Sequence, residues 1–301
     1  MNGTIAIIGT GRVGATVAYT LIIKNLFSRL ILVDSNTERC EGEMRDLADA
    51  LAFSETTHIV QGSIPDARAA DIIIITAGHA QKDPGESRLE LYEKNRTIIE
   101  NIFKQLAPLS PETLVLVVTN PLDLMTLTAL KSSGLPNTNV FGTGTWLDTQ
   151  RLRRYLGYEL DVAPESIDAF VIGEHGDHQC VAWSQAHAGG VSIKNLGIDQ
   201  QTLDTIAQKT AVEVYSIIKL KCATFYGIAA CAADICETII FDQKRIIPVS
   251  CWNPELEICL SIPVVLGKKG IERHIIMQLS EKERTQLRTS AERLKKMIKR
   301  A

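Results

Sequence analysis

The chain has 301 residues, enough for about two domains, and its 45% hydrophobic and 22% charged residues are ordinary for a soluble globular protein. The net charge of -3 at pH 7 argues against broad electrostatic attraction to nucleic acid or to an anionic membrane. The seven cysteines are scattered and form no CxxC pair, which favours reduced thiols in a cytoplasmic protein over a disulfide framework or a zinc site. We expect no signal peptide, and no apolar run reaches the ~18 residues of a transmembrane helix.

Residues 4–34 predict a strand, a glycine-rich turn, a helix and a second strand. The apolar run ends at Ile8, the sequence Gly-Thr-Gly-Arg-Val-Gly follows directly, and apolar residues at helical spacing come next. In this context a GxGxxG pattern indicates a dinucleotide-binding turn rather than an ordinary one. Gly9 permits the tight turn, Gly11 lets the backbone approach a pyrophosphate, and Gly14 lets the helix pack close to the strand.

The helix after this turn predicts where the phosphates of the dinucleotide bind. Its first N–H groups, including those of Arg12 and Val13, lie at the positive end of the helix dipole and can receive phosphate. The second strand ends in Asp34, 20 residues past Gly14, where a carboxylate can accept hydrogen bonds from both ribose hydroxyls. Because that carboxylate would repel the additional phosphate of NADP, the predicted cofactor is NAD.

The rest of the first half alternates strands with helices, which predicts a Rossmann-type α/β fold with a doubly wound parallel sheet. The predicted strands are 4–8, 30–34, 58–61, 71–76, 114–118 and 139–141, and the predicted helices are 13–25, 38–52, 88–107 and 123–133. Ligands bind at the carboxyl ends of such strands. The polar residues found there include Asp34, Thr76, Ala77, Gly78 and Asn120.

After about residue 143 the pattern changes to that of a mixed α+β domain. We predict strands at 167–172, 245–250 and 257–262, helices at 146–156, 200–219, 224–240 and 280–299, and a glycine-marked hairpin region at 180–193. The expected domains are therefore a dinucleotide-binding domain over residues 1–143 and a catalytic domain over residues 144–301. No Gly/Ser-rich linker separates them, so we expect the two to pack closely around a cleft.

Two segments of the second half could carry chemistry. His175 follows a predicted strand in the sequence GEHGDH, where an imidazole could move a proton near neutral pH. The alternatives are an ordinary loop histidine, or a metal site with Asp177 and His178. Asp148 and Arg151 lie three apart on one helix face, so they could form an ion pair. Alternatively, Asp148 could hold a histidine while Arg151 binds a carboxylate.

Residues 80–88 follow the strand end at 76–78 and are polar, with a proline and a glycine. Such a segment suits a mobile lid beside the cofactor. A closing lid could bring Arg88 onto a polarised carbonyl, where it would stabilise developing negative charge. The alternative is a surface loop with a solvated arginine.

These segments together resemble the L-lactate/malate dehydrogenase family over nearly the whole chain. The matching blocks occur in the family's order and at close to its spacing: TAG, QKDPGESRLEL, VTNPLDLMT, GTGTWLDTQRLR, GEHGD, KCATFYGIA and ICLSIPVVLGKKGIER. The resemblance implies reversible hydride transfer between NAD and a small 2-hydroxy acid, most closely lactate. It also implies a homo-oligomer, either dimer or tetramer. From a different class, a non-catalytic NAD-binding protein that kept the fold is the remote alternative.

The resemblance also implies a role for individual residues. His175 matches the proton-transfer histidine, Asp148 the carboxylate that orients it, and Arg151 the arginine that binds the substrate carboxylate. Arg88 matches the lid arginine that polarises the reacting C–O bond. The remaining matches are Asn120 near the nicotinamide and substrate, Thr224 at the floor of the substrate pocket, and Thr76, Ala77 and Gly78 along the cofactor.

Two features depart from the family's pattern. In the family a glutamine at this position favours a neutral methyl group, so the resemblance implies that Gln81 favours a monocarboxylate, but the inserted Asp83 could turn Lys82 inward to attract a second carboxylate. A longer lid could also admit bulkier side chains, so malate-type and hydroxyisocaproate-type substrates stay open. Many bacterial members bind fructose 1,6-bisphosphate with an arginine and a histidine, but here Asp168 takes the histidine's place beside Arg153. We therefore predict weak or no activation by this sugar phosphate.

Overall fold

The computed structural model describes residues 3–54, 58–79 and 88–300, without the side chains of Arg88 and Arg300. In the first half, six parallel strands lie in the order β3-β2-β1-β4-β5-β6. They are β1 (Thr4–Ile8), β2 (Arg29–Val33), β3 (His58–Gln61), β4 (Ile72–Ile75), β5 (Leu114–Val117) and β6 (Val140–Gly142). The strand order reverses between β1 and β4, where α/β sheets of this kind bind their ligands.

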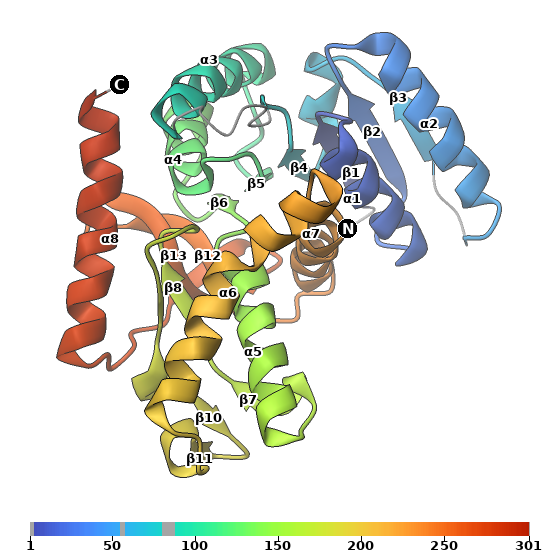
Figure 1. Ribbon diagram of the computed structural model, residues 1–301. Helices are drawn as coiled ribbons and strands as arrows, with labels where there is room; N and C mark the ends of the chain where they lie inside the picture. Colours follow the sequence, from blue (N-terminus) through green and yellow to red (C-terminus); the bar gives the residue numbers. More distant parts are fainter. Residues whose placement is uncertain (1–2, 55–57, 80–87, 301) are drawn as a thin grey trace.

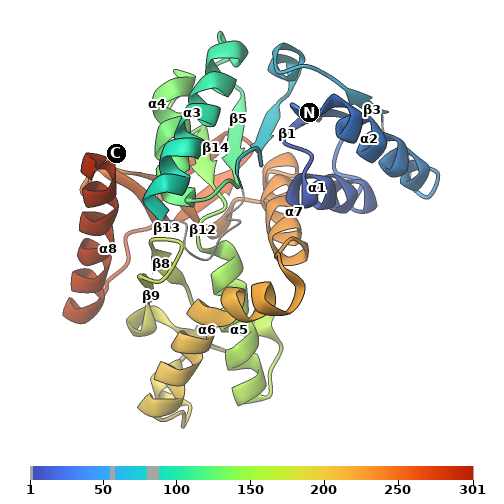
Figure 2. The same cartoon turned by 45° about the horizontal axis from the view of Figure 1, so that its top comes forward.

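Helices cover both faces of this parallel sheet (Figures 1 and 2). They are α1 (Arg12–Ile23), α2 (Thr37–Leu51), η1 (Pro65–Ala69), α3 (Arg88–Leu106) and α4 (Leu122–Ser133). Alternate residues of β1 divide between the two faces, because successive side chains of a strand point in opposite directions. Ile5 and Ile7 pack in the cluster that contains α1, whereas Ala6 and Ile8 pack in the cluster that contains α3 and α4. The predicted doubly wound sheet is confirmed.

The second half is a mixed α+β unit, as predicted. Its helices are α5 (Trp146–Leu160), η2 (Pro164–Ser166), η3 (Trp183–Gln185), η4 (Ile193–Asn195), α6 (Gln200–Lys221), α7 (Tyr226–Ile240) and α8 (Glu281–Arg300). Its strands are β7 (Ile167–Asp168), β8 (Val171–Gly173), β9 (Gln179–Val181), β10 (His187–Ala188), β11 (Val191–Ser192), β12 (Arg245–Asn253), β13 (Ile258–Gly267) and β14 (Gly270–His274). A side chain of Asp199 caps α6 by accepting a hydrogen bond from the Thr202 N–H at 2.8 Å.

The two halves share one sheet. The long hairpin of β12 and β13 continues the parallel sheet, because Ser250 of β12 pairs with Gly142 of β6. On the other side of the hairpin, Ser261 of β13 pairs with Gly173 of β8. The sheet therefore runs from the predicted dinucleotide domain to the strand that precedes His175. We keep the boundary at residues 143 and 144 as a proposal.

The predicted strand 167–172 is wrong as a single element. The structure divides it, because Ile167 pairs with Ala188 in a small sheet of β11, β10 and β7, whereas Val171 pairs with Val181 in the large sheet. The strand β14, which was not predicted, pairs antiparallel with β13. The division of 167–172 comes from pairing with two separate segments, which local hydrophobic patterns do not encode, whereas β14 forms a hairpin with β13 directly before it.

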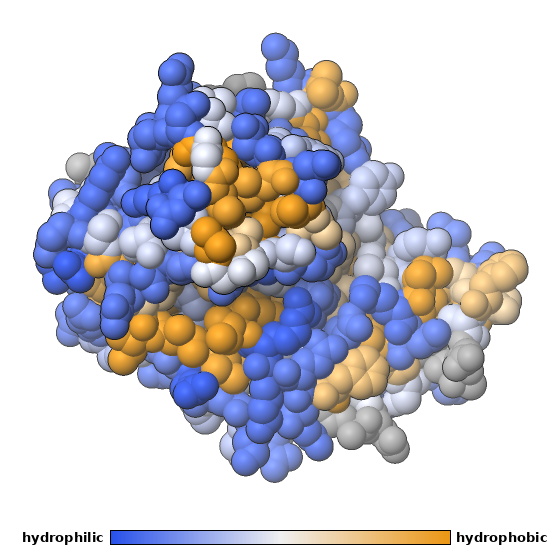
Figure 3. Space-filling view, turned by 90° about the horizontal axis from the view of Figure 1, so that it is seen from below, coloured by the Kyte–Doolittle hydropathy of each residue, from blue (hydrophilic) through white to orange (hydrophobic). Residues whose placement is uncertain are grey.

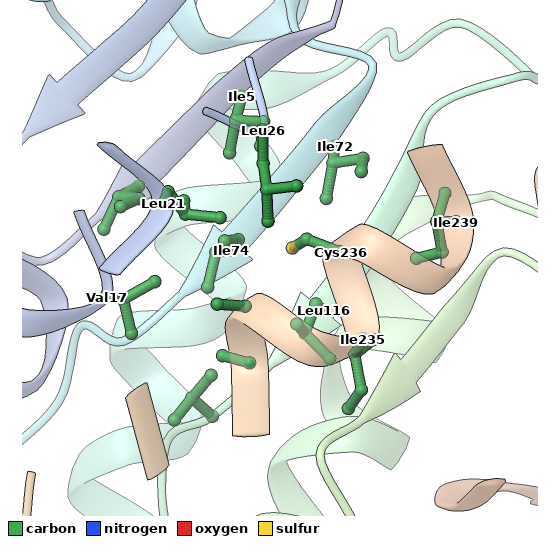
Figure 4. Packing of buried hydrophobic residues seen from close by; sticks show 14 of the residues in the cluster. Ile5, Val17, Leu21, Leu26, Ile72, Ile74, Leu116, Ile235, Cys236 and Ile239 are labelled. Atoms are coloured by element: carbon green, nitrogen blue, oxygen red, sulfur yellow. The ribbon is translucent and has the colours of Figure 1, made fainter. Parts of the chain in front are cut away.

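The main hydrophobic core joins the two halves (Figure 4). Val17 and Leu21 of α1 pack in one buried cluster with Ile235, Cys236 and Ile239 of α7. Lys24, just after α1, also pairs with Glu237 of α7 across the surface. The expected close packing of the halves is confirmed. Within the residues described, no helix combines the length and apolar character needed to cross a membrane.

Candidate active site

The glycine-rich turn after β1 has the shape that a dinucleotide needs. Gly9 has a φ of +106°, and a Cβ there would lie 2.5 Å from the backbone nitrogen of Ala77. A Cβ on Gly14 would lie 1.9 Å from the carbonyl oxygen of Gly9, so α1 can approach the turn only without a side chain there. A Cβ on Gly11 would meet nothing within 4 Å. The space beside Gly11 is therefore open to a pyrophosphate, whereas Gly9 and Gly14 shape the turn.

The first turn of α1 is free to receive an anion. Its N-cap is Gly11, which has no side chain to accept the hydrogen bonds of the first turn, and that turn contains no acidic residue. The helix starts at Arg12, whose side chain is exposed, and Val13 is half-buried. The side chain of Thr76 supports the turn from β4 by donating to the Gly9 carbonyl at 2.6 Å. Unpaired helix N–H groups and the dipole together favour phosphate.

Asp34, at the end of β2, is an ionised and well-anchored acceptor. It accepts hydrogen bonds from the backbone N–H groups of Thr10 at 2.7 Å and Asn36 at 2.9 Å, and from Arg39 at 2.6 Å. Burial would raise the pKa of Asp34, but the hydrogen bonds from Asn36, Arg39 and Thr10 outweigh it and lower that pKa. A fixed carboxylate at the end of β2 suits ribose hydroxyls and opposes a 2′-phosphate, so these residues fit NAD.

Asn95, which was not predicted as a site residue, joins the ends of β4 and β5. This fully buried side chain of α3 accepts from the His79 N–H at 2.7 Å and donates to the Asn120 carbonyl at 2.7 Å. Thr119 adds a second link by donating to the Ala77 carbonyl at 2.8 Å. The sequence feature that could have identified Asn95 is its position on the buried face of the helix, four residues from both Leu91 and Ile99. A buried amide at such a position needs hydrogen-bond partners.

Gly78 and Asn120 lie at this same edge of the sheet. The side chain of Asn120 is exposed, as a residue that binds a ligand must be before the ligand arrives. A Cβ on Gly78 would lie 2.5 Å from the Thr119 methyl group, so the backbone passes too close for any other residue. The predicted cofactor residues of β1, β2, β4 and β5 therefore lie at the carboxyl ends of four strands.

His175, Asp148 and Arg151 come together in the second half. Asp148, in the first turn of α5, is 3% exposed. One of its carboxylate oxygens lies 2.7 Å from Nδ1 of His175, and the other accepts a hydrogen bond from Arg151 at 3.0 Å. Because an ionised carboxylate only accepts, Nδ1 of His175 carries the proton and Nε2 is left for a substrate. Asp148 therefore forms both of the contacts that the sequence left as alternatives, the ion pair with Arg151 and the hydrogen bond with a histidine.

The charges of this group favour a protonated imidazole. Burial would lower the pKa of His175, but the charge and hydrogen bond of Asp148, with a further contribution from the charge of Asp123, raise it. Burial likewise would raise the pKa of Asp148, but the partners His175 and Arg151 lower it. The His175 side chain is 26% exposed, so the imidazole is held by protein on one side and open on another.

Thr224 lies in the turn between α6 and α7 and is half-buried. The first turn of α7 packs near the start of α5, since a Cβ on Gly227 would lie 3.2 Å from the Leu147 side chain. The predicted lid residues Gln81, Lys82 and Asp83, and the side chain of Arg88, lie outside the described residues.

Asp177 and His178, the partners of His175 in the alternative metal site, each contact a side chain of another element. His178 contacts Arg293 of α8, and the Tyr215 hydroxyl of α6 donates to Asp177. In residues 3–54, 58–79 and 88–300 no group of three or more His, Cys, Asp or Glu side chains could hold a metal ion.

Comparison with known proteins identifies the family. The model for the NAD-binding domain of lactate/malate dehydrogenases matches residues 4–142, and the model for their alpha/beta C-terminal domain matches residues 145–301. The chain belongs to the lactate/malate dehydrogenase family. It therefore binds NAD and is an NAD-dependent 2-hydroxy acid dehydrogenase, as the resemblance implied.

Individual relatives match along most of their length. L-lactate dehydrogenase A of Rhizopus oryzae is 42% identical over 98% of this chain and 92% of its own. L-lactate dehydrogenase of Thermus aquaticus is 36% identical over 97% of each chain. The crystal structure of minor L-lactate dehydrogenase from Enterococcus mundtii in its ligands-bound form superimposes with a TM-score of 0.95 at 32% identity, covering 100% of this chain and 98% of that one.

Proposed function

We propose that this protein is an L-lactate dehydrogenase that interconverts lactate and pyruvate, with His175 as the acid and base. The observation that carries the proposal is the shared carboxylate of Asp148, which holds an imidazole and a guanidinium side by side. A 2-hydroxy acid needs both groups, since one must exchange a proton with the hydroxyl and the other must bind the carboxylate. The relatives named L-lactate dehydrogenase support lactate as the substrate.

His175 moves the proton of the reaction. Bound NAD supplies or accepts the hydride at C2 of the substrate. In the direction of pyruvate reduction, the protonated imidazole donates its Nε2 proton to the substrate oxygen, while Asp148 keeps Nδ1 in place and stabilises the imidazolium. In lactate oxidation, neutral His175 accepts the hydroxyl proton.

Arg151 orients the substrate. Its contact with Asp148 uses one of the five N–H donors of a guanidinium, so the others can bind the substrate carboxylate in a two-pronged contact. This contact would point C2 at the nicotinamide and so reduce the entropy cost of the reaction. We also propose that Arg88 polarises the reacting C–O bond, and that Asn120, Thr224 and Gln81 contact the substrate.

NAD is proposed to lie across the carboxyl ends of the parallel strands. The turn and helix start hold the pyrophosphate, Asp34 the ribose hydroxyls, and the loops after β4 and β5 the nicotinamide half. The proposed residues are Gly9, Gly11, Arg12, Val13, Gly14, Asp34, Thr76, Ala77, Gly78 and Asn120.

A homo-oligomer in the cytoplasm is part of the proposal. Figure 3 shows hydrophobic patches between hydrophilic residues on one face of the molecule. Large apolar side chains that are exposed on α1, α6 and α7 or next to them would be covered by a second copy: Tyr19, Ile23, Tyr215, Ile218, Leu220, Tyr226 and Phe241. Dimer and tetramer both fit, and a size measurement by light scattering distinguishes them.

A substrate panel tests the proposal. Pyruvate, oxaloacetate, 2-oxobutyrate and 2-oxoisocaproate are compared by kcat/KM with NADH. We expect the highest value for pyruvate, because the family resemblance implies that Gln81 suits a neutral methyl group. A preference for oxaloacetate would instead place a cation such as Lys82 at the substrate, and one for 2-oxoisocaproate would indicate a wider pocket. No activity with any of the four would favour a non-catalytic NAD-binding protein.

A further inference from the structure

A second buried carboxylate, Asp123, contacts the segment that carries His175. Asp123 lies in the first turn of α4 and is 2% exposed. One oxygen accepts a hydrogen bond from the backbone N–H of His175 at 2.8 Å, and the other accepts one from the hydroxyl of Ser250 at 2.6 Å. Three separate elements, α4, β12 and the loop after β8, therefore meet at this carboxylate.

The burial of Asp123 is unusual enough to require a reason. A carboxylate that is removed from water and accepts its hydrogen bonds from a backbone N–H and a hydroxyl is costly for the fold. The start of α4 offsets part of the cost, because the positive end of a helix dipole favours a negative side chain in the first turn. The two hydrogen bonds offset a further part. No role proposed above for the site residues uses Asp123.

We propose that Asp123 is a positioning residue for His175, which it holds through the main chain and whose protonated form it favours through its charge. The inference rests on the proposed role of His175 as acid and base. Asp148 forms a hydrogen bond with the imidazole ring, whereas Asp123 accepts one from the backbone N–H of the same residue. His175 is thus held at its ring by one carboxylate and at its backbone by another, and the two carboxylates come from different helices.

Some charged groups around His175 favour its protonated form, and others oppose it. Asp148 and Asp123 favour the imidazolium, and Arg151 opposes it. Around Asp123, Glu174 favours the neutral acid, whereas His175 and the Ser250 hydroxyl favour the carboxylate. The neighbouring thiols of Cys251 and Cys259 stay neutral, because burial and nearby negative charge raise their pKa values.

The charge of Asp123 is itself sensitive to pH. Burial raises the pKa of Asp123 to about 6, although the hydrogen bonds from Ser250 and the His175 backbone oppose this. The carboxylate is therefore charged at neutral pH and becomes neutral in mild acid. Removing the Ser250 hydroxyl should raise the pKa of Asp123 further, so that its charge is lost at a higher pH.

Two variants and a control test the proposal. Asp123→Asn keeps the size of the side chain and an oxygen for the His175 N–H but removes the charge. Ser250→Ala keeps the carboxyl group and removes one of its hydrogen bonds. The matched control is Asp66→Asn, at an exposed carboxylate in η1 that contacts Ser63 and lies outside the candidate site.

The measurement is the NMR titration of the His175 ring, assigned by its absence in His175→Asn, together with the pH profile of kcat/KM for pyruvate reduction. In Asp123→Asn we expect the pKa of His175 to fall by about 0.5–1 unit. We expect a smaller fall in Ser250→Ala and none in Asp66→Asn, with the alkaline limb of the rate profile moving in parallel. A soluble Ser250→Ala protein keeps the test decisive if Asp123→Asn does not fold.

An unchanged titration of His175 in both variants would overturn the proposal. So would an equal loss of kcat/KM at every pH, because that result indicates only a structural hydrogen bond. The NMR titration does not depend on turnover. A failure of the positioning role of Asp123 can therefore be distinguished from a failure of the acid and base role of His175. If the native protein does not reduce pyruvate, the acid and base role is lost, while the titration still reports on Asp123.

Discussion

Asp148 serves two partners, and this sharing sets the chemistry of the site at the scale of single residues. Each oxygen of the carboxylate has its own partner, His175 or Arg151, so neither contact competes with the other. The sequence left an ion pair and a histidine contact as alternatives, because spacing along a helix shows which side chains share a face but not what approaches that face. The position of His175 depends on β8, which directly precedes it and pairs with β13 on one side and β9 on the other.

The raised pKa of His175 predicts the pH dependence of the reaction. Pyruvate reduction needs the imidazolium, so kcat/KM should be level at low pH and fall as the pH rises through a value above 6.5. In Asp148→Asn the negative charge is lost, so the fall should begin at a lower pH. The check is kcat/KM for pyruvate across about pH 5 to 9. An alkaline limb at the same pH in both proteins would contradict the prediction.

Arg151→Lys should weaken substrate binding. An ammonium is a point charge that cannot make the two parallel hydrogen bonds of a guanidinium, so KM for pyruvate should rise by about 10–100-fold. Arg154→Lys is the matched control on the same helix, because Arg154 pairs with Glu213 instead. Steady-state kinetics at saturating NADH provide the measurement. An unchanged KM in Arg151→Lys would remove Arg151 from the substrate carboxylate.

At the scale of elements, the first half was the more predictable part. Its strands are short apolar runs separated by helices, and the predicted and observed bounds of each strand differ by at most one residue at either end. The breaks that the sequence did not predict, at β7 and β8, arise where neighbouring residues pair with different sheets. Asn95 and Asp123 were missed for a related reason, since their hydrogen bonds reach across elements distant in the chain.

Substitutions in the glycine-rich turn can distinguish residues needed for folding from residues needed for cofactor binding. Gly14→Ala places a Cβ against the Gly9 carbonyl and should destabilise the protein by about 1–3 kcal/mol or more. Gly11→Ala meets nothing within 4 Å and has an ordinary φ of -69°, so its stability should stay within about 0.5 kcal/mol of the native protein. It should nevertheless bind NADH more weakly, because the methyl group occupies the space beside the pyrophosphate.

Thermal unfolding and NADH fluorescence titration measure the two effects. Native affinity for NADH in a folded Gly11→Ala protein would show that the pyrophosphate lies elsewhere. An undisturbed melting temperature in Gly14→Ala would contradict the close approach of α1 to the turn.

At the scale of the whole molecule, the site depends on the union of the two halves. The cofactor residues end strands of the first half, whereas His175, Asp148 and Arg151 belong to the second. The shared sheet and the cluster between α1 and α7 hold these groups in one frame (Figure 1). The sequence predicted both sets of residues, but only the resemblance to a family implied that they form one site. The position of one set relative to the other depends on the pairing of β12 with β6 and β13, which local sequence patterns do not predict.

Fructose 1,6-bisphosphate should have little effect on this protein. The guanidinium of Arg153 lies 3.5 Å from Asp168 and stacks on Trp146 and Phe170, so its charge is already partly compensated. The carboxylate would also repel a phosphate. We expect the native protein to have the same half-saturation constant for pyruvate with and without fructose 1,6-bisphosphate. In Asp168→His we expect the sugar phosphate to lower this constant. A large drop in the half-saturation constant of the native protein would contradict this.

The most direct test of the account is His175→Asn, followed by two measurements on the same preparation. NADH binding, measured by fluorescence, should stay near that of the native protein, because the cofactor residues lie in the first half of the chain. Pyruvate-dependent NADH oxidation should fall by about 10²–10⁴-fold, because asparagine cannot donate the proton. Turnover equal to that of the native protein would contradict the assignment of His175 as the acid and base.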